Sequence, residues 1–100
     1  MLQKPDFHTA RLLALADNLA ESQDYDQNRW ETCICGHACR LFRLGASPKG
    51  DFYAVGRELG LDGQTTRMLF GESRPESPTR EVASRVVRHL ALTGEVDWTI

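Results

Sequence analysis

The segment from residue 33 to residue 44 is apolar on nearly every side. Before residue 40 its only strongly polar side chain is His37, and Arg40 and Arg43 follow near its C-terminal end. Cations in the last turn of a helix interact favourably with the helix dipole, and a helix without a polar face is normally buried. We therefore predict a buried central helix over residues 33–44, with small residues that let neighbouring helices approach closely.

The rest of the chain carries repeated signals for helix ends. An amphipathic stripe runs from about Thr9 to Ser22, short helices are predicted over 51–59 and 62–71, and a longer helix is predicted over 77–93. β-Branched residues never alternate with polar ones over more than four positions, so strands have little support. The expected N-caps are Asp6 or Thr9, Thr32, Asp51, Asp62 and Ser77, and the expected terminating glycines are Gly45, Gly60, Gly71 and Gly94.

Length and composition limit the architecture to one small core. One hundred residues, of which 23 are Leu, Ile, Val or Phe, suffice for one buried core and are too few for two. The expected fold is all-α, a single domain over residues 1–100 built as a compact bundle of four to five helices around the central helix. The N-terminal sequence lacks the apolar stretch of a secretory signal, and no apolar run is long enough to span a membrane. We therefore expect a cytoplasmic protein with reduced thiols and no membrane partner.

Two short motifs resemble a group of short uncharacterised proteins from actinobacteria and their phages. The motifs are Trp30 followed by Cys33-Ile34-Cys35-Gly36-His37-Ala38, and the C-terminal Thr93-Gly94-Glu95-Val96-Asp97-Trp98. Proteins of that group commonly have a Cys-Gly-Thr sequence ahead of the first motif, and here residues 28–32 stand in its place. The resemblance implies a compact cytosolic helical protein and no particular activity.

Cys33, Cys35, His37 and Cys39 place four soft metal ligands within seven residues. On a helix, at about 100° per residue, Cys33 and His37 share one face and the other two cysteines share nearly the opposite face. In a strand the four side chains would spread over roughly 20 Å, too far for one zinc ion with bonds near 2.3 Å. These residues are therefore expected to fill the core, with no metal and no cofactor. A zinc-binding domain that uses them is a third hypothesis for the function.

Cys33 and His37 are also i,i+4 neighbours, as a nucleophile and its base can be. Small apolar surroundings raise the pKa of a thiol, and no carboxylate lies nearby in the sequence to orient the imidazole. His37 is instead expected to be a core histidine hydrogen-bonded to a carbonyl oxygen. The sequence also shows no glycine-rich phosphate loop and no acid pair in an apolar setting, so we do not expect an enzyme.

Residues 55–69 have the outline of a helix-turn-helix. Apolar residues flank a glycine turn, and in a DNA reader Gln64, Thr65 and Arg67 would face base edges. Thr66 falls where that motif usually buries a branched aliphatic side chain, and a net charge of −2 gives little attraction to phosphates. A DNA-binding regulator is thus the alternative function, and a nucleic-acid partner is not favoured.

The remaining features favour contact with a protein. Arg80, Arg85 and Arg88 form either a solvated helix face, on which Glu81 can pair with Arg85, or a surface for an acidic partner. Trp98 either folds back over the core or belongs to an exposed aromatic patch. The expected function is accordingly that of a non-catalytic protein-interaction or accessory factor, whose partner and oligomeric state the sequence leaves open.

Overall fold

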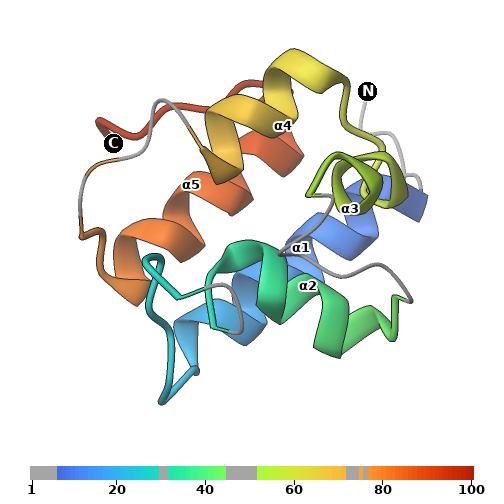
Figure 1. Ribbon diagram of the computed structural model, residues 1–100. Helices are drawn as coiled ribbons and strands as arrows, with labels where there is room; N and C mark the ends of the chain where they lie inside the picture. The colour runs from blue at the N-terminus through green and yellow to red at the C-terminus, as the bar shows by residue number, and fades with distance from the viewer. Residues whose placement is uncertain (1–6, 30–31, 45–51, 72–74, 76) are drawn as a thin grey trace.

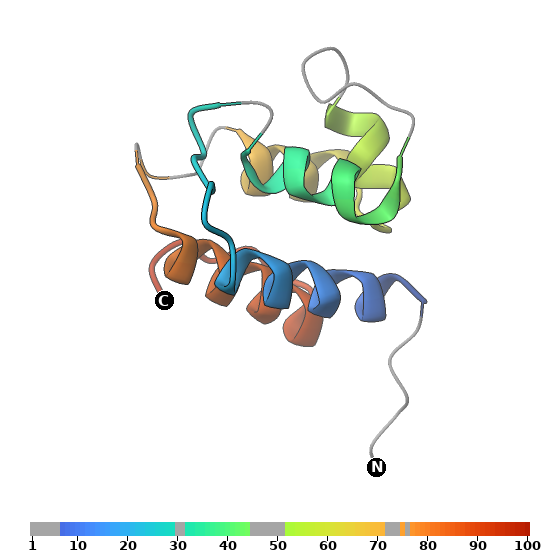
Figure 2. The same ribbon diagram turned by 90° about the horizontal axis from the view of Figure 1, so that it is seen from below.

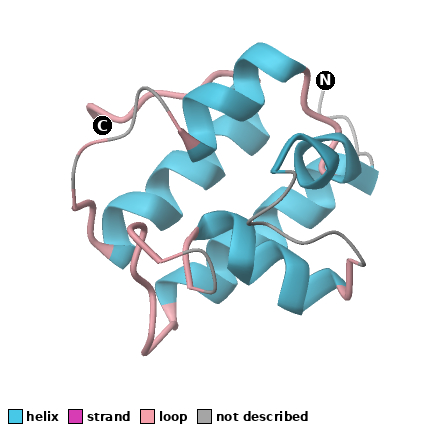
Figure 3. Cartoon of the chain, viewed as in Figure 1, coloured by secondary structure: helices cyan, strands magenta, loops and turns pink. Residues whose placement is uncertain are grey.

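The computed structural model describes residues 7–29, 32–44, 52–71, 75 and 77–100. Within these ranges the chain forms five α-helices and no strand (Figures 1 and 3). The helices are α1 (Phe7–Ala20), α2 (Ile34–Phe42), α3 (Phe52–Glu58), α4 (Gly63–Phe70) and α5 (Arg80–Thr93). The expected all-α fold with four to five helices is therefore confirmed.

The helices are arranged in two layers, seen edge-on in Figure 2. In one layer α1 and α5 lie side by side and run in opposite directions, and α2, α3 and α4 cover one side of that pair (Figures 1 and 2). Both long helices repeat apolar residues every three or four positions, so each has one apolar face to bury. The buried residues of this pair are Leu12, Leu15, Ala16 and Leu19 of α1 and Ala83, Ser84, Val86, Val87 and Leu90 of α5.

Two polar contacts fix α5 along α1. The Ser84 hydroxyl is buried and donates to the Ala16 carbonyl oxygen at 2.7 Å, which satisfies the hydroxyl inside the core. At the surface, the Arg88 guanidinium lies 2.6 Å from the Asp17 carboxylate. These directional contacts set the position of α5 along α1. Apolar packing alone would allow the two helices to slide past each other more easily.

The N-terminal half of α2 lies inside the protein. Its residues 34–38 are all buried, which confirms the central helix expected from the sequence. The C-terminal half reaches the surface, where Arg40 and Leu41 are exposed. The helix is shorter than the predicted 33–44, because Cys33 is extended and Arg43 adopts a left-handed conformation with φ of 54°.

Several helix ends lie where the sequence predicts them. Asp62 accepts the Thr65 N–H at 2.7 Å and thereby caps α4. Gly60 closes the turn after α3 with φ of 79°, and Gly94 ends α5 with φ of 82°. Both values lie in the left-handed region that glycine adopts at little cost.

Other predicted helix starts are wrong by one or two residues. Cys33 caps α2 in place of Thr32, because its extended backbone brings its sulfur to the N–H of the third helical residue. Thr79 caps α5 in place of Ser77 by the same geometry, with its hydroxyl oxygen 3.2 Å from that N–H. Thr9 lies inside α1 and not at its start, because this helix already begins at Phe7. The predictions for Asp6, Trp30, Gly45, Asp51 and the turn at 46–50 fall outside the described residues.

The C-terminal tail folds back onto α4. The Trp98 indole N–H donates to the Met68 carbonyl oxygen at 2.9 Å, and the ring packs against the core while half-buried. Of the two alternatives for this tryptophan, the structure shows the lid over the core. No described helix has the length and apolar character needed to cross a membrane.

A close approach between α3 and α4 gives a test of this packing. A Cβ placed on Gly56 would lie 2.7 Å from the Thr66 methyl group and closer still to the Thr66 hydroxyl. We therefore expect Gly56→Ala to lower the free energy of unfolding by about 1–3 kcal/mol, as overpacking in a buried contact does. Urea unfolding monitored by circular dichroism measures the change.

The matched control is Gly63→Ala, where the added methyl would meet only a ring carbon of Tyr53 at 4.0 Å. This change is expected to be close to neutral, because Gly63 is the first residue of α4 and the added methyl meets no close atom. In the double variant Gly56→Ala/Thr66→Ala, the loss should be smaller than the sum of the two single losses. Additive losses would contradict the contact.

Candidate functional site

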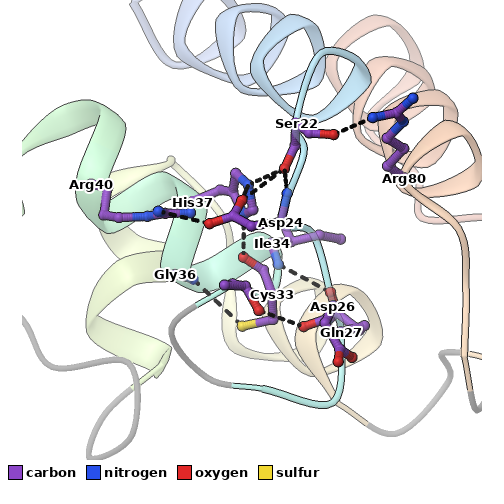
Figure 4. A network of polar contacts seen from close by, with 11 residues as sticks. Ser22, Asp24, Asp26, Gln27, Cys33, Ile34, Gly36, His37, Arg40 and Arg80 are labelled. Atoms are coloured by element: carbon purple, nitrogen blue, oxygen red, sulfur yellow. Dashed lines mark hydrogen bonds and ion pairs between the residues drawn. The ribbon is translucent and has the colours of Figure 1, made fainter.

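Two side chains accept backbone N–H groups in the first turn of α2: Gln27 from the preceding loop and Cys33 from the N-cap position (Figure 4). Gln27 is buried, and its side-chain oxygen accepts both the Ile34 N–H at 3.0 Å and the Tyr25 hydroxyl at 2.8 Å. The Cys33 sulfur accepts the Gly36 N–H at 3.5 Å. Backbone N–H groups in the first turn of a helix lack helical partners, so these contacts fix the loop of residues 22–29 to α2.

His37 lies beneath this loop with 3% of its surface exposed. Its Nδ1 is 3.1 Å from the Cys33 carbonyl oxygen, which confirms a core histidine bonded to a carbonyl. A carbonyl oxygen only accepts, so Nδ1 carries a proton. In the neutral imidazole Nε2 is consequently the acceptor, and it lies 2.9 Å from the Ser22 hydroxyl.

Asp24 joins this histidine to the protein surface. One of its carboxylate oxygens lies 3.0 Å from the Ser22 hydroxyl and 3.3 Å from His37 Nε2, and the other lies 3.2 Å from the Arg40 guanidinium (Figure 4). The Arg40 hydrogen bond, and after it the one from Ser22, lowers the pKa of Asp24. We call Ser22, Asp24, His37 and Arg40 the His37 network. It lines an open surface pocket together with Asn18, Glu21 and Leu41.

The His37 network has part of the geometry of a serine nucleophile and its base. In a catalytic triad the carboxylate bonds to the ring nitrogen that faces away from the serine. Here that nitrogen faces the Cys33 carbonyl, and Asp24 lies on the Nε2 side, where it competes for the same Ser22 proton. Arg80 also donates to the Ser22 carbonyl oxygen, which ties the loop to α5. The arrangement therefore favours a structural role, in which Ser22 joins the loop to α2 and α5.

The cysteines serve different packing roles. Cys33 caps α2 with its sulfur, and its carbonyl oxygen is the group that the His37 ring contacts through Nδ1. Cys35 is buried and Cys39 half-buried, and burial raises the pKa of both thiols. All three are thiols, and the described residues contain no group of three or more His, Cys, Asp or Glu placed to hold a metal ion.

The helix-turn-helix outline of residues 55–69 is present in α3 and α4. Thr66 is buried, and its hydroxyl is satisfied by the Asp62 carbonyl oxygen at 2.7 Å, so threonine fits the position expected for an aliphatic residue. Gln64 and Arg67 are exposed on α4, and Thr65 is half-buried. Gln64 and Thr65 share a surface depression with Glu95 of the C-terminal tail, which places a carboxylate beside the candidate base-reading residues.

The arginines of α5 mostly bind within the protein. Arg80 contacts the loop after α1, and Arg88 pairs with Asp17. Glu81 pairs with Arg80 at 3.2 Å and not with Arg85, so that part of the prediction is wrong. Arg85 is exposed.

A groove where α1, α2 and α3 meet was not indicated by any local motif. It encloses about 430 Å³, and we call it the arginine groove; its lining residues are Arg11, Phe42, Arg43, Leu44, Ala54, Arg57 and Glu58. The Arg11 guanidinium lies 4.5 Å from the centre of the Phe7 ring and 5.0 Å from that of Phe42, and it donates to the Glu58 carbonyl oxygen at 3.0 Å. These contacts hold three helices around one cationic surface.

Sequence reasoning missed both of these sites. Ser22 and Asp24 belong to a polar stretch that reads as an ordinary loop, although a serine and an aspartate two residues apart, just after a helix, are typical of side-chain-capped turns. The groove arginines lie 32 and 14 positions apart in the chain, at residues 11, 43 and 57. No local pattern joins residues at such separations.

The lowered pKa of Asp24 gives a pH-dependent test of the His37 network. A carboxyl group whose pKa is lowered by folding adds stability above its ordinary value of 3.8, and that stability is lost as the pH falls through the lowered value. Asp24→Asn should therefore be less stable than the parent chain at neutral pH. The difference should disappear as the pH falls below about 4. Urea unfolding midpoints across this range measure it.

Glu21→Gln is the matched control, because Glu21 lines the same pocket without an ion pair to any described residue. It removes the same charge from the same pocket without removing an ion pair, so its unfolding midpoint at neutral pH should stay close to that of the parent chain. An Asp24→Asn profile parallel to that of the parent chain at all pH values would contradict the network.

Comparisons with known proteins add no guide to these sites. No family model, no curated protein and no solved structure matches this chain. The function is accordingly argued from the residues of the sites themselves.

Proposed function

We propose that this chain is a non-catalytic helical protein that binds a partner protein through the arginine groove. The observation that carries the proposal is the composition of the groove, in which guanidinium groups surround the apolar side chains of Phe42, Leu44 and Ala54. Arginine and aromatic residues are enriched at the centres of protein interfaces, where they provide both contact area and hydrogen bonds.

An exposed aromatic ring extends the groove. Phe7 is 65% exposed, although it is among the larger apolar side chains of the protein. Its ring lies against the Arg11 guanidinium, which itself packs on Phe42 inside the groove. A partner that covers the groove would also cover this ring, and burial of an aromatic side chain contributes strongly to binding.

The His37 network supports a non-catalytic role. Its contacts join the loop of residues 22–29 to α2 and α5, and they leave Ser22 shared between an imidazole and a carboxylate. The three thiols fit a reducing compartment, so the proposal places this accessory factor in the cytoplasm.

Site-specific photo-crosslinking tests the groove directly. A benzoylphenylalanine at Ala54, which lines the groove, should form adducts with a partner protein in an extract of the source cells. The same group at Leu92, which is 68% exposed on α5, should not. Arg57→Glu should abolish the Ala54 adducts, because reversal of a charge at an interface costs several kcal/mol. Adducts that survive this change, or that form equally from Leu92, would contradict the proposal.

DNA binding is the second candidate function. The observation that favours it is the geometry of α3 and α4: Gly60 in the turn between them is left-handed, and Gly56 of α3 packs directly on Thr66 of α4. Two features place it second. Glu95 lies beside Gln64, where a phosphate or base would approach, and the chain has a net charge of −2. Contacts to phosphates supply most of the affinity of DNA-binding proteins.

We expect no retention of mixed DNA fragments in a mobility-shift assay at about 50 mM salt, where phosphate contacts are strong. The control is the Arg67→Ala variant, which removes an exposed cation of α4. Retention by the parent chain that this variant abolishes would favour the second candidate over the first.

A further inference from the structure

The arginine groove has a charge opposite to that of the whole chain. Its lining contains three arginines and one glutamate, a local excess of two positive charges, whereas the chain has a net charge of −2. Local potential guides which ligands approach a surface and which orientation they adopt. The groove thus favours an anionic ligand that is small enough to avoid the acidic remainder of the protein.

Two of the three groove arginines are available to a ligand. Arg11 is occupied by Glu58 and by two aromatic rings. Arg43 and Arg57 are exposed, and neither forms an ion pair with a described residue. A guanidinium group offers paired N–H donors whose spacing matches the two oxygens of a carboxylate.

Arg43 is held at the groove by an unusual backbone conformation. It is the one non-glycine residue with positive φ among the described residues, with φ of 54° and ψ of 45°. Its N–H bonds to the Cys39 carbonyl oxygen and ends α2. Glycine is the usual residue at such a helix end, because a side chain there is strained. Strained positions of this kind cluster at binding sites, and here the strain sets a cation on the groove edge.

We propose that the groove binds an acidic segment of a partner protein, with Asp or Glu carboxylates on Arg43 and Arg57 and an apolar side chain against Phe42 and Leu44. The inference rests on the proposed function and names the chemistry of the partner. A protein segment fits better than a nucleic acid, because it supplies both carboxylates and apolar groups. Glu58 in the groove and the acidic charge of the whole chain oppose a nucleic acid, whose negative charge repeats at every nucleotide.

The test uses the purified full chain and a short fluorescein-labelled peptide that contains one Glu, one Asp and one Leu. Fluorescence anisotropy should show saturable binding that weakens severalfold between about 50 and 300 mM salt. The same peptide with Gln and Asn in place of Glu and Asp should not bind. Arg57→Ala should raise the Kd about tenfold, as loss of a charge-assisted hydrogen bond does. Arg85→Ala, an exposed arginine outside the groove, should leave the Kd unchanged.

Arg43→Gly separates binding from folding. Glycine fits the left-handed backbone, so the thermal midpoint of this variant should be unchanged or raised while its Kd for the acidic peptide rises about tenfold. Equal binding of the acidic and neutral peptides, or unchanged binding by both groove variants, would overturn the proposal. So would tighter binding of a phosphopeptide or of DNA at the same residues.

The outcome also separates this inference from the proposed function. If the acidic peptide does not bind but the crosslinks from Ala54 form and depend on Arg57, the groove binds a partner of other chemistry and only the acidic assignment fails. If neither is observed, both are wrong.

Discussion

The antiparallel contact between α1 and α5 supports every other part of this protein. The two helices come from opposite ends of the chain, and each buries one apolar stripe against the other and against the second layer. Ser84 reaches the Ala16 carbonyl through this contact, so even the buried hydroxyl there is satisfied. The remaining helices are short, with seven to nine residues each, and isolated helices of that length are not stable in water. They therefore depend on the surface that α1 and α5 present.

The two surface sites lie at opposite ends of α1. At its C-terminal end, Ser22 and Asp24 join the following loop to His37 and Arg40 of α2. Nearer its N-terminal end, Arg11 lies between Phe7 and Phe42 and bonds to α3. The first site is composed of groups that satisfy one another, and the second keeps cations exposed. This difference in hydrogen-bond satisfaction supports the proposal that a partner binds at the second site, whereas the first site joins the loop to α2.

Much of the fold follows from local patterns in the sequence. The stripes of α1 and α5, the Asp62 cap and the glycines at 60 and 94 are local signals, and the structure confirms each of them. The wrongly predicted helix starts also have a local cause. Thr32 and Cys33 are adjacent candidates for one cap, and the choice depends on which backbone is extended. Gln27 helps to make that choice, because it accepts the next N–H from a loop that has no periodic pattern.

The sequence by itself determined the helical class and most of the residues that form the core, because these depend on spacings of three or four positions and on single capping residues. Tertiary structure alone decided which surfaces are formed. Arg11, Arg43 and Arg57 meet because three separate helices converge, and Ser22 reaches His37 because the loop folds over α2. Such contacts join residues distant in the chain, and their geometry is set by how the helices pack, which no local spacing records.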